Sequence, residues 1–297
     1  MDAVVLSETG GPEVLRVSTV ADPVAGAGEV VVAVAAAALN RRDVFLRKGI
    51  APSPLPVIPG SDGAGTIRAI GAGVSGLSEG DEVIILPSLG WGGGEAAPAP
   101  GFRILGGPDD GTYAELIRIP AENVFPKPPR LSFEEAAALP LAGLTAYRAL
   151  VSRAGIRSGE TVLIIGIGGG VATTALHIAR AAGCRVLVTS SSHEKIARAR
   201  ELGAAAGVNY GEGDWVAAVK ELSGGGVDVV IDSVGSTIAR TLSSRPEGPA
   251  ASASAVSNGR FTPVQTSRRL SPSTARACRS ARPPPRARGP VRPRTGA

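Results

Sequence analysis

Short apolar runs separated by glycine and proline fill the first 125 residues of the chain. Glu29–Ala37 is the longest run, and Ala3–Leu6 and Leu15–Val17 are shorter ones. Apolar runs of this length, bounded by turn residues, predict β-strands. Residues 55–86 repeat the pattern with frequent glycines, which is typical of a curled, barrel-like β domain. The polar-headed stretch Leu39–Gly49 predicts a short helix or loop.

The pattern changes after the proline-rich link Phe125–Arg130, where helical periodicity alternates with short β-branched runs. Leu131–Arg153 predicts one helix with Ser132 as its N-cap and with a buried face made of Leu139, Leu141, Leu144, Tyr147, Ala149 and Leu150. Strands are then predicted at Thr161–Ile165, Arg185–Thr189, Gly207–Asn209 and Val227–Ile231, and helices at Val171–Ala182, Glu194–Leu202 and Asp214–Leu222. Alternating strands and helices predict an α/β fold with a doubly wound parallel sheet.

A glycine-rich turn joins the first of these strands to the helix that follows it. Its residues are Gly166, Gly168, Gly169 and Gly170, followed by Val171. Glycine adopts the backbone angles of such a turn at little cost, and a bare backbone lets a pyrophosphate approach closely. Free N–H groups and the helix dipole then hold the negative charge. Ala172 occupies the place of the usual third glycine. The pattern predicts a dinucleotide site, with a plain tight turn as the alternative.

The end of the second parallel strand bears on which dinucleotide binds. An NAD enzyme places an Asp or Glu there, against the ribose 2′-hydroxyl. This chain has hydroxyl side chains instead, Ser190 and Ser191 among them, with Lys195 a few residues on. Hydroxyls and a lysine suit a 2′-phosphate, so we predict NADPH as the cofactor. Ser192 can also serve as the N-cap of the next helix, and the two roles are compatible.

The charge of the chain is unevenly distributed. The whole sequence carries +5, but residues 241–297 hold 11 basic residues, all Arg, and one acidic residue, so residues 1–240 have 20 basic and 25 acidic residues. The last 57 residues contain only six Val, Leu, Phe or Ile, which predicts a disordered tail. The abundance of Arg without Lys is typical of a GC-rich gene translated out of frame. We therefore hypothesise a frameshift near residue 240, which resequencing of the gene would test.

Cysteine content and hydropathy limit the setting in which the chain works. Cys184 and Cys278 are too few for a disulfide framework or a zinc cage, and no apolar stretch is long enough to cross a membrane. The N-terminus does not resemble a signal peptide. We expect a cytoplasmic protein with a small-molecule substrate, no membrane partner, and nucleic-acid binding only through its basic tail.

Seven motifs, in order, carry a resemblance to a known family. They are MDAVVLSETGGPEVL, ALNRRDVFLRKG, PVIPGSDGAGTIRAIGAGV, GDEVI, DGTYAELIRIP, AALPLAGLTAYRAL and VDVVIDSVG. About residues 1–240 resemble the medium-chain dehydrogenase/reductase superfamily, most closely its quinone-oxidoreductase-like, zinc-dehydrogenase-related members. The resemblance implies a GroES-like substrate domain at residues 1–125 and an incomplete Rossmann NADP-binding domain at residues 126–240, with a cofactor cleft between them and the tail at 241–297. Members of this family form homodimers, but the dimer-forming C-terminal region does not match here.

The departures from the family pattern concern zinc. Zinc-using members carry a cysteine in the loop that is Asn40–Asp43 here, and a His-Glu pair where this chain has Ser61 and Asp62. Residues 89–107 replace the family's structural zinc lobe and contain no cysteine. A catalytic zinc site takes about three protein ligands, which Asp62 alone cannot supply. We therefore predict no bound zinc, and Asp62 is either a buried structural carboxylate or a functional one.

The resemblance and the sheet pattern together nominate the remaining site residues. Asn40 matches the residue that lines the nicotinamide pocket in zinc-free relatives, Thr145 a residue beside the cofactor, and Tyr210 one near the adenosine phosphate. Structural alternatives remain open, because Asn40 can cap a helix, Thr145 can bond within its helix, and Tyr210 can end a strand. Ser233 and Val234 follow a parallel strand, where ligands bind. His177 and His193 have no neighbours that indicate a triad, and we interpret both as structural or solvated.

These observations predict an NADPH-dependent, zinc-independent oxidoreductase that passes hydride to a quinone or an α,β-unsaturated carbonyl. The cofactor would supply the chemistry and the cleft would supply orientation. Two alternatives remain: an alcohol or aldehyde dehydrogenase of the same superfamily, and a truncated cofactor-binding or tail-driven interaction protein whose activity is impaired by the atypical C-terminus.

Overall fold

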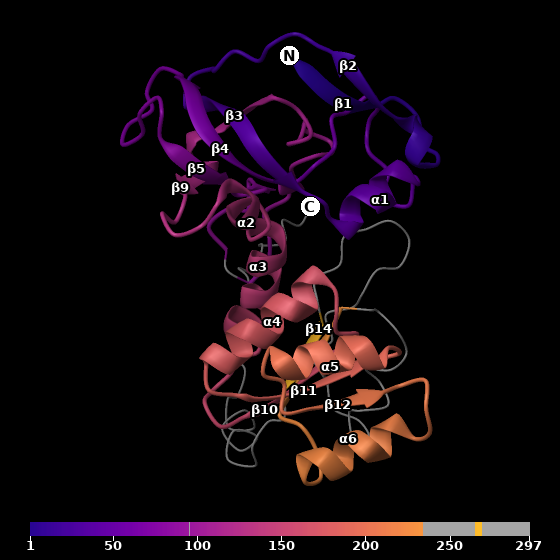
Figure 1. The fold of residues 1–297 in the computed structure, drawn as a ribbon. Coiled ribbons are helices and arrows are strands. Elements are labelled where there is room, and N and C mark those ends of the chain that lie inside the picture. Colours follow the sequence, from indigo (N-terminus) through magenta and orange to yellow (C-terminus); the bar gives the residue numbers. More distant parts are fainter. Residues whose placement is uncertain (95, 234–264, 269–297) are drawn as a thin grey trace, which may run out of the picture.

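The structure is a computed structural model that describes residues 1–94, 96–233 and 265–268. Its upper part in Figure 1 is built on a five-stranded antiparallel sheet of order β8-β3-β4-β5-β9. The strands are β3 (Glu29–Ala38), β4 (Asp62–Ile70), β5 (Glu82–Ile85), β8 (Leu116–Pro120) and β9 (Val124–Pro126). Two pairs flank this sheet: β1 (Asp2–Leu6) with β2 (Leu15–Thr19), and β6 (Ser88–Leu89) with β7 (Arg103–Ile104). The helix α1 (Arg41–Arg47) and the 3₁₀ turns η1 (Pro12–Val14) and η2 (Ala121–Asn123) complete this part.

The core of this sheet forms from the apolar residues that the strands turn inward. Val30, Val32, Ile67, Ile85 and Ile119 are all buried in one cluster. The sheet curls where β3 shifts register against β4, between Val34 and Ala36. Gly65 lies opposite this shift, and a Cβ atom there would meet the Ala33 carbonyl oxygen at 1.9 Å. Only glycine permits the two backbones to approach so closely.

A broken helical segment leads from this sheet into the rest of the chain, and it corrects the predicted single helix over Leu131–Arg153. It comprises α2 (Phe133–Ala137), α3 (Pro140–Tyr147) and a π-helical turn, η3 (Arg148–Arg153). Ser132 caps α2 as predicted, because its hydroxyl accepts a hydrogen bond from the Glu135 N–H at 3.2 Å. Pro140 interrupts the helix, since it has no N–H and its ring clashes with a preceding turn.

The segment also differs from the prediction in which side chains are buried. Leu141, Ala149 and Leu150 are buried as predicted, but Leu139, Leu144 and Tyr147 are 43%, 39% and 52% exposed. The prediction was wrong for these last three, because Leu139 precedes α3, and Leu144 and Tyr147 lie on the side of α3 opposite to its buried alanines.

The lower part of the molecule in Figure 1 is a mostly parallel sheet of order β12-β11-β10-β13-β14. Its parallel strands are β10 (Thr161–Ile165), β11 (Arg185–Ser190), β12 (Ala206–Asn209) and β13 (Val229–Asp232), and its helices are α4 (Gly170–Ala181), α5 (His193–Glu201) and α6 (Trp215–Ser223). Every strand and helix predicted in this region is present, with ends displaced by at most two residues.

Helices cover both faces of this sheet, which explains its continuous apolar strands. Along β10, Val162 and Ile164 pack in one cluster with Leu176 of α4, whereas Leu163 and Ile165 pack in another with Val219 of α6. Alternate residues therefore supply two cores. Among the described residues, no helix is long and apolar enough to cross a membrane.

One short segment of the predicted tail forms a strand in the structure. β14 (Gln265–Arg268) pairs antiparallel with β13. These four residues cover the edge of β13, whose backbone N–H and C=O groups they pair. The remainder of the predicted tail lies outside the described residues.

Candidate functional site

The glycine turn lies between β10 and α4, at the carboxyl edge of the parallel sheet. Gly166 and Gly168 have φ angles of 75° and 115°, which strongly favour glycine. The Gly166 and Ile167 N–H groups both donate to the Thr189 carbonyl oxygen, at 3.1 and 2.8 Å. The neighbouring strand β11 therefore holds the turn in place. Gly168, Gly169 and Gly170 are exposed at its tip.

The tip of the turn fits a phosphate group. Gly169 is the N-cap of α4, and no side chain caps this helix. The first N–H groups of a helix have no partner within the helix, so here they remain free to bind an anion. A Cβ atom at Gly169 would meet nothing within 4 Å, which shows open space in front of the turn. Ala172 is buried, at 1% exposure, where α4 packs on the sheet. Gly166, Gly168, Gly169, Gly170 and Val171 would hold the pyrophosphate of a dinucleotide.

The serines after β11 differ in their surroundings. Ser190 is 4% exposed, and its hydroxyl accepts a hydrogen bond from the Ser192 N–H at 3.2 Å. Ser192 caps α5, because its hydroxyl accepts from the Lys195 N–H at 3.3 Å. The capping role considered for Ser192 is therefore present. Ser191 is exposed. Of the two serines predicted to contact the 2′-phosphate, Ser191 is the one that a ligand can reach.

Lys195 covers the glycine turn. A Cβ atom at Gly168 would lie 2.8 Å from Lys195 Cδ, so the lysine stem crosses directly above this glycine. Tyr210 is nearby, since its N–H donates to the Ser190 carbonyl oxygen at 3.1 Å. The structure thus gathers Gly168, Ser191, Lys195 and the Tyr210 backbone at one edge of the sheet.

A carboxylate that the sequence analysis missed lies next to these residues. Glu212 Oε1 is 2.6 Å from His193 Nε2 and accepts a hydrogen bond from the Asn209 amide at 2.7 Å. His193 begins α5, directly after Ser192. Glu212 follows β12 rather than β11, so the search for an acid at the end of β11 could not find it. His193, interpreted as structural or solvated, is exposed and paired with this carboxylate.

Asn40 and Asp62 form the second half of the candidate site. Asn40 is the N-cap of α1, and its amide donates to Asp62 Oδ2 at 2.9 Å. The other carboxylate oxygen, Asp62 Oδ1, accepts from the Leu141 N–H in the first turn of α3, at 2.8 Å. Asp62 is 1% exposed. Burial raises its pKa to about 6, although the bonds from Asn40 and Leu141 act in the opposite direction.

A second carboxylate, Asp43, shares this region. Asp43 Oδ2 accepts from the Asn40 N–H and from the Tyr113 hydroxyl, both at 2.7 Å. Burial raises the pKa of Asp43 as well, and the negative charge of Asp43 contributes to the raised pKa of Asp62. Two acids and an amide are therefore held together where α1, β4 and α3 meet.

The helix α3 links the two halves of the site and lies between the two sheets (Figure 1). The Leu141 N–H of α3 donates to Asp62. Ala142, the residue after Leu141, lies against the glycine turn, because a Cβ atom at Gly170 would be 3.4 Å from the Ala142 Cβ. Thr145 donates its hydroxyl to the Leu141 carbonyl at 2.7 Å, which is the within-helix bond considered as its structural alternative. Ser233 is exposed after β13, and Val234 lies outside the described residues.

The donor set does not fit zinc. No group of three or more His, Cys, Asp and Glu side chains in the described part of the chain could hold a metal ion. Both oxygens of Asp62 already accept hydrogen bonds, and Asn40 contributes an amide rather than a thiolate. Zinc sites are built from cysteine, histidine and carboxylate ligands.

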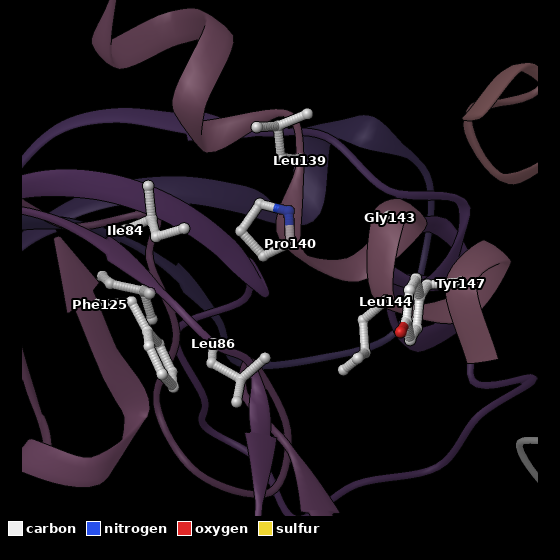
Figure 2. A pocket seen from close by; sticks show the side chains of 9 residues that line it. Ile84, Leu86, Phe125, Leu139, Pro140, Gly143, Leu144 and Tyr147 are labelled. Carbon is white, nitrogen blue, oxygen red and sulfur yellow. The ribbon is translucent and has the colours of Figure 1, made fainter. Parts of the chain in front are cut away.

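An apolar pocket of about 290 Å³ lies on another flank of α3. Figure 2 shows Leu139, Leu144 and Tyr147 around it, facing Ile84 and Phe125. None of the predicted cofactor residues lines this pocket. The exposed side chains of Leu144 and Tyr147 in α3 line this pocket, whereas Asn40 and Asp62 do not.

Comparison with known proteins identifies the family. Residues 26–129 match the alcohol dehydrogenase GroES-like domain, and residues 170–260 match the zinc-binding dehydrogenase domain. A solved structure of an NAD-dependent alcohol dehydrogenase is 45% identical, with a TM-score of 0.77 over 82% of this chain and 73% of that one. The chain belongs to the medium-chain dehydrogenase/reductase superfamily. The predicted fold class, a GroES-like domain followed by a Rossmann-like parallel sheet, is thereby confirmed.

Two curated members of the superfamily show how much of a full-length relative is present. A zinc-type alcohol dehydrogenase-like protein of Schizosaccharomyces pombe is 43% identical over 187 residues, which cover 62% of this chain and 54% of that protein. Human quinone oxidoreductase is 33% identical over 236 residues, covering 78% of this chain and 66% of that enzyme. The chain thus spans a little over half the length of the first relative and about two thirds of the second.

Proposed function

We propose that this chain is an NADP(H)-dependent oxidoreductase that transfers hydride to a quinone or an α,β-unsaturated carbonyl without zinc. The exposed and uncapped glycine turn carries most weight for this function. It offers free N–H groups, open space and a helix dipole at one point, and these together suit a pyrophosphate. Human quinone oxidoreductase, a relative of this chain, carries this kind of activity in its name.

The cofactor preference follows from the groups beside the turn. Ser191 is exposed, and the Lys195 stem lies over Gly168. Within the described residues the Lys195 ammonium makes no hydrogen bond or ion pair, so it is available to a 2′-phosphate. A lysine ammonium is a compact charge that pairs well with phosphate oxygens. These two residues favour NADPH over NADH.

Residues around Asn40 would orient the reaction. A bound reduced nicotinamide supplies the hydride, and the protein supplies position and hydrogen bonds. One hydrogen of the Asn40 amide is bound by Asp62, which leaves a second hydrogen for a ligand. That second hydrogen can donate to an acceptor oxygen as negative charge develops on it. A quinone or enone is already electron-poor, so it needs less polarisation than a simple ketone.

A second candidate function is an NAD(H)-dependent alcohol dehydrogenase. Glu212 supports it, because a carboxylate paired with His193 at the start of α5 could accept a hydrogen bond from a ribose 2′-hydroxyl. The NAD-dependent alcohol dehydrogenase at 45% identity is consistent with this alternative. The absence of a fitting metal-ligand set among the described residues disfavours it, because polarising a simple alcohol or ketone is the task zinc performs in such sites.

Cofactor titration of the purified full chain would distinguish the two functions. Binding of NADPH and NADH is followed by nucleotide fluorescence, and turnover is measured with 1,4-benzoquinone and, separately, with NAD⁺ and simple alcohols. We expect tighter NADPH binding and quinone-dependent NADPH oxidation that a chelator does not slow. Alcohol oxidation with NAD⁺ would favour the second candidate. Binding without any turnover would refute the proposed activity and indicate an impaired cofactor-binding protein.

Ser191→Asp tests the cofactor preference at the exposed serine. A carboxylate there would repel the 2′-phosphate, and we expect NADPH affinity to fall by about tenfold or more while NADH affinity is retained. Ala217→Asp, an exposed position in the first turn of α6, introduces the same charge and serves as the control. Equal losses in the two variants, or a parent that already prefers NADH, would contradict the assignment.

A further inference from the structure

Asp62 makes contacts that extend beyond its own strand. It begins β4, where it pairs with Ala38 of β3, and its carbonyl oxygen accepts a hydrogen bond from the Thr112 hydroxyl at 2.8 Å. Its backbone is therefore held by the sheet. Its side chain binds the Asn40 amide with one oxygen and the first turn of α3 with the other. The two bonds join partners that lie 22 and 79 residues away in the chain.

An ionised carboxylate differs from other acceptors in a way that matters for Asn40. An amide has a donor end and an acceptor end of nearly the same shape, and its orientation depends on its partners. A carboxylate only accepts, so Asp62 keeps the Asn40 nitrogen turned toward it. The side-chain oxygen of an asparagine at position 62 could still accept from the Leu141 N–H. Its NH₂ group would then face the NH₂ group of Asn40, and two donors cannot bond each other. Asn40 would have to turn its amide over.

We propose that Asp62 is a positioning residue for hydride transfer, which fixes the Asn40 amide and the first turn of α3 relative to each other. Because this role concerns the reacting end of the cofactor, it rests on the function proposed above. Ala142 follows Leu141 and lies against the Gly170 position of the cofactor turn, at 3.4 Å from the Cβ that a side chain there would have. Asp62 thus connects Asn40 with the helix that borders the phosphate site.

The groups around Asp62 predict how this role depends on pH. On the α1 side, Asp62 is faced by Asn40 and Asp43, and Arg42 lies beside Asp43. On the α3 side it is faced by the Leu141 N–H. From the segment before β8 it is faced by Thr112 and Tyr113. Tyr113 stays protonated, since burial and the bond to Asp43 raise its pKa. Asp62, with a pKa of about 6, loses its acceptor-only character when it is protonated at lower pH.

Asp62→Asn in the full chain tests the proposal. We expect NADPH affinity and the KM for benzoquinone to stay within about threefold of the parent, while kcat falls by about 100-fold, the effect typical of a misplaced positioning group. The parent's kcat should decline below about pH 6, and this decline should vanish in the variant. Ser61→Ala is the matched control, because Ser61 is equally buried but its hydroxyl bonds the Leu105 carbonyl and the Arg42 guanidinium rather than the Asn40 amide. It should lose stability and keep the parent's kcat and pH profile.

A second readout does not require turnover. In ¹⁵N-labelled protein, the NMR signal of the Asn40 side-chain amide is assigned by its loss in Asn40→Ala. Its chemical shift should change with a midpoint near pH 6 in the parent, as Asp62 titrates, and should not change in Asp62→Asn. An inactive parent would refute the proposed function, whereas this titration would still test the contact. A parent-like kcat and pH profile in Asp62→Asn, or an Asn40 amide that does not titrate in the parent, would overturn the role of Asp62.

Discussion

Gly169→Asp should weaken cofactor binding without weakening the fold. Gly169 is the N-cap of α4, with φ −90° and ψ 159°, a backbone conformation open to any residue. A Cβ atom there meets nothing within 4 Å. Aspartate is among the preferred N-cap residues, and its charge suits the helix dipole. The substitution should therefore stabilise the free protein by a few tenths to about 1 kcal/mol.

The same side chain would occupy the place of the phosphate. It would accept hydrogen bonds from the first N–H groups of α4, which the anion otherwise binds. Its charge would also repel a phosphate about 4 Å away by about 1 kcal/mol in a water-like medium and about 4 kcal/mol near a protein surface. The dissociation constant for NADPH should rise by between about fivefold and about 1000-fold. Stability and affinity would thus change in opposite directions.

Nucleotide fluorescence and thermal unfolding of the free protein measure the two effects. Gly169→Asn is the control, because it caps the helix without the charge, so the difference between the two variants isolates electrostatic repulsion. NADPH affinity equal to the parent's in a folded Gly169→Asp protein would refute the phosphate site at this turn. A melting temperature several degrees lower would refute the inference of open space in front of it.

Two further predictions concern stability. The pKa of Asp62 is about 6 in the folded protein and 3.8 in the unfolded chain, so the folded state binds this proton more tightly. Protonated Asp62 therefore stabilises the fold at low pH, and this contribution is lost as the pH rises from about 4 to 6. The stability of Asp62→Asn relative to the parent should therefore increase by about 3 kcal/mol across this window in urea unfolding, and a pH-independent difference would contradict the raised pKa. Ser132→Ala removes the N-cap of α2 and should lower the free energy of unfolding in urea by about 1 kcal/mol, whereas Ser132→Asn should keep most of the parent's stability.

Sequence pattern predicted the elements whose cause is local. The run Thr161–Ile165 required a strand buried on both faces, and the glycines after it required a turn that other residues adopt only with strain. Ser132 and Ser192 were recognisable as helix caps because their partners lie three residues away. Such features depend on neighbouring residues alone, so the order of the strands and helices in residues 161–232 could be predicted without knowledge of their packing.

Other features depended on partners that are distant in the chain. The face of α3 that is buried was one of them: Leu144 and Tyr147 lie opposite the buried Ala142, and all three are apolar, so the sequence did not show which side packs inward. Glu212 reached the predicted cofactor edge from a different strand end.

Sequence by itself determined the glycine turn and placed Asn40 and Asp62 among the candidates. Only the tertiary structure decided that the Asp62 carboxylate binds both Asn40 and the start of α3, because contacts across 22 and 79 residues arise from how the two sheets and α3 pack together.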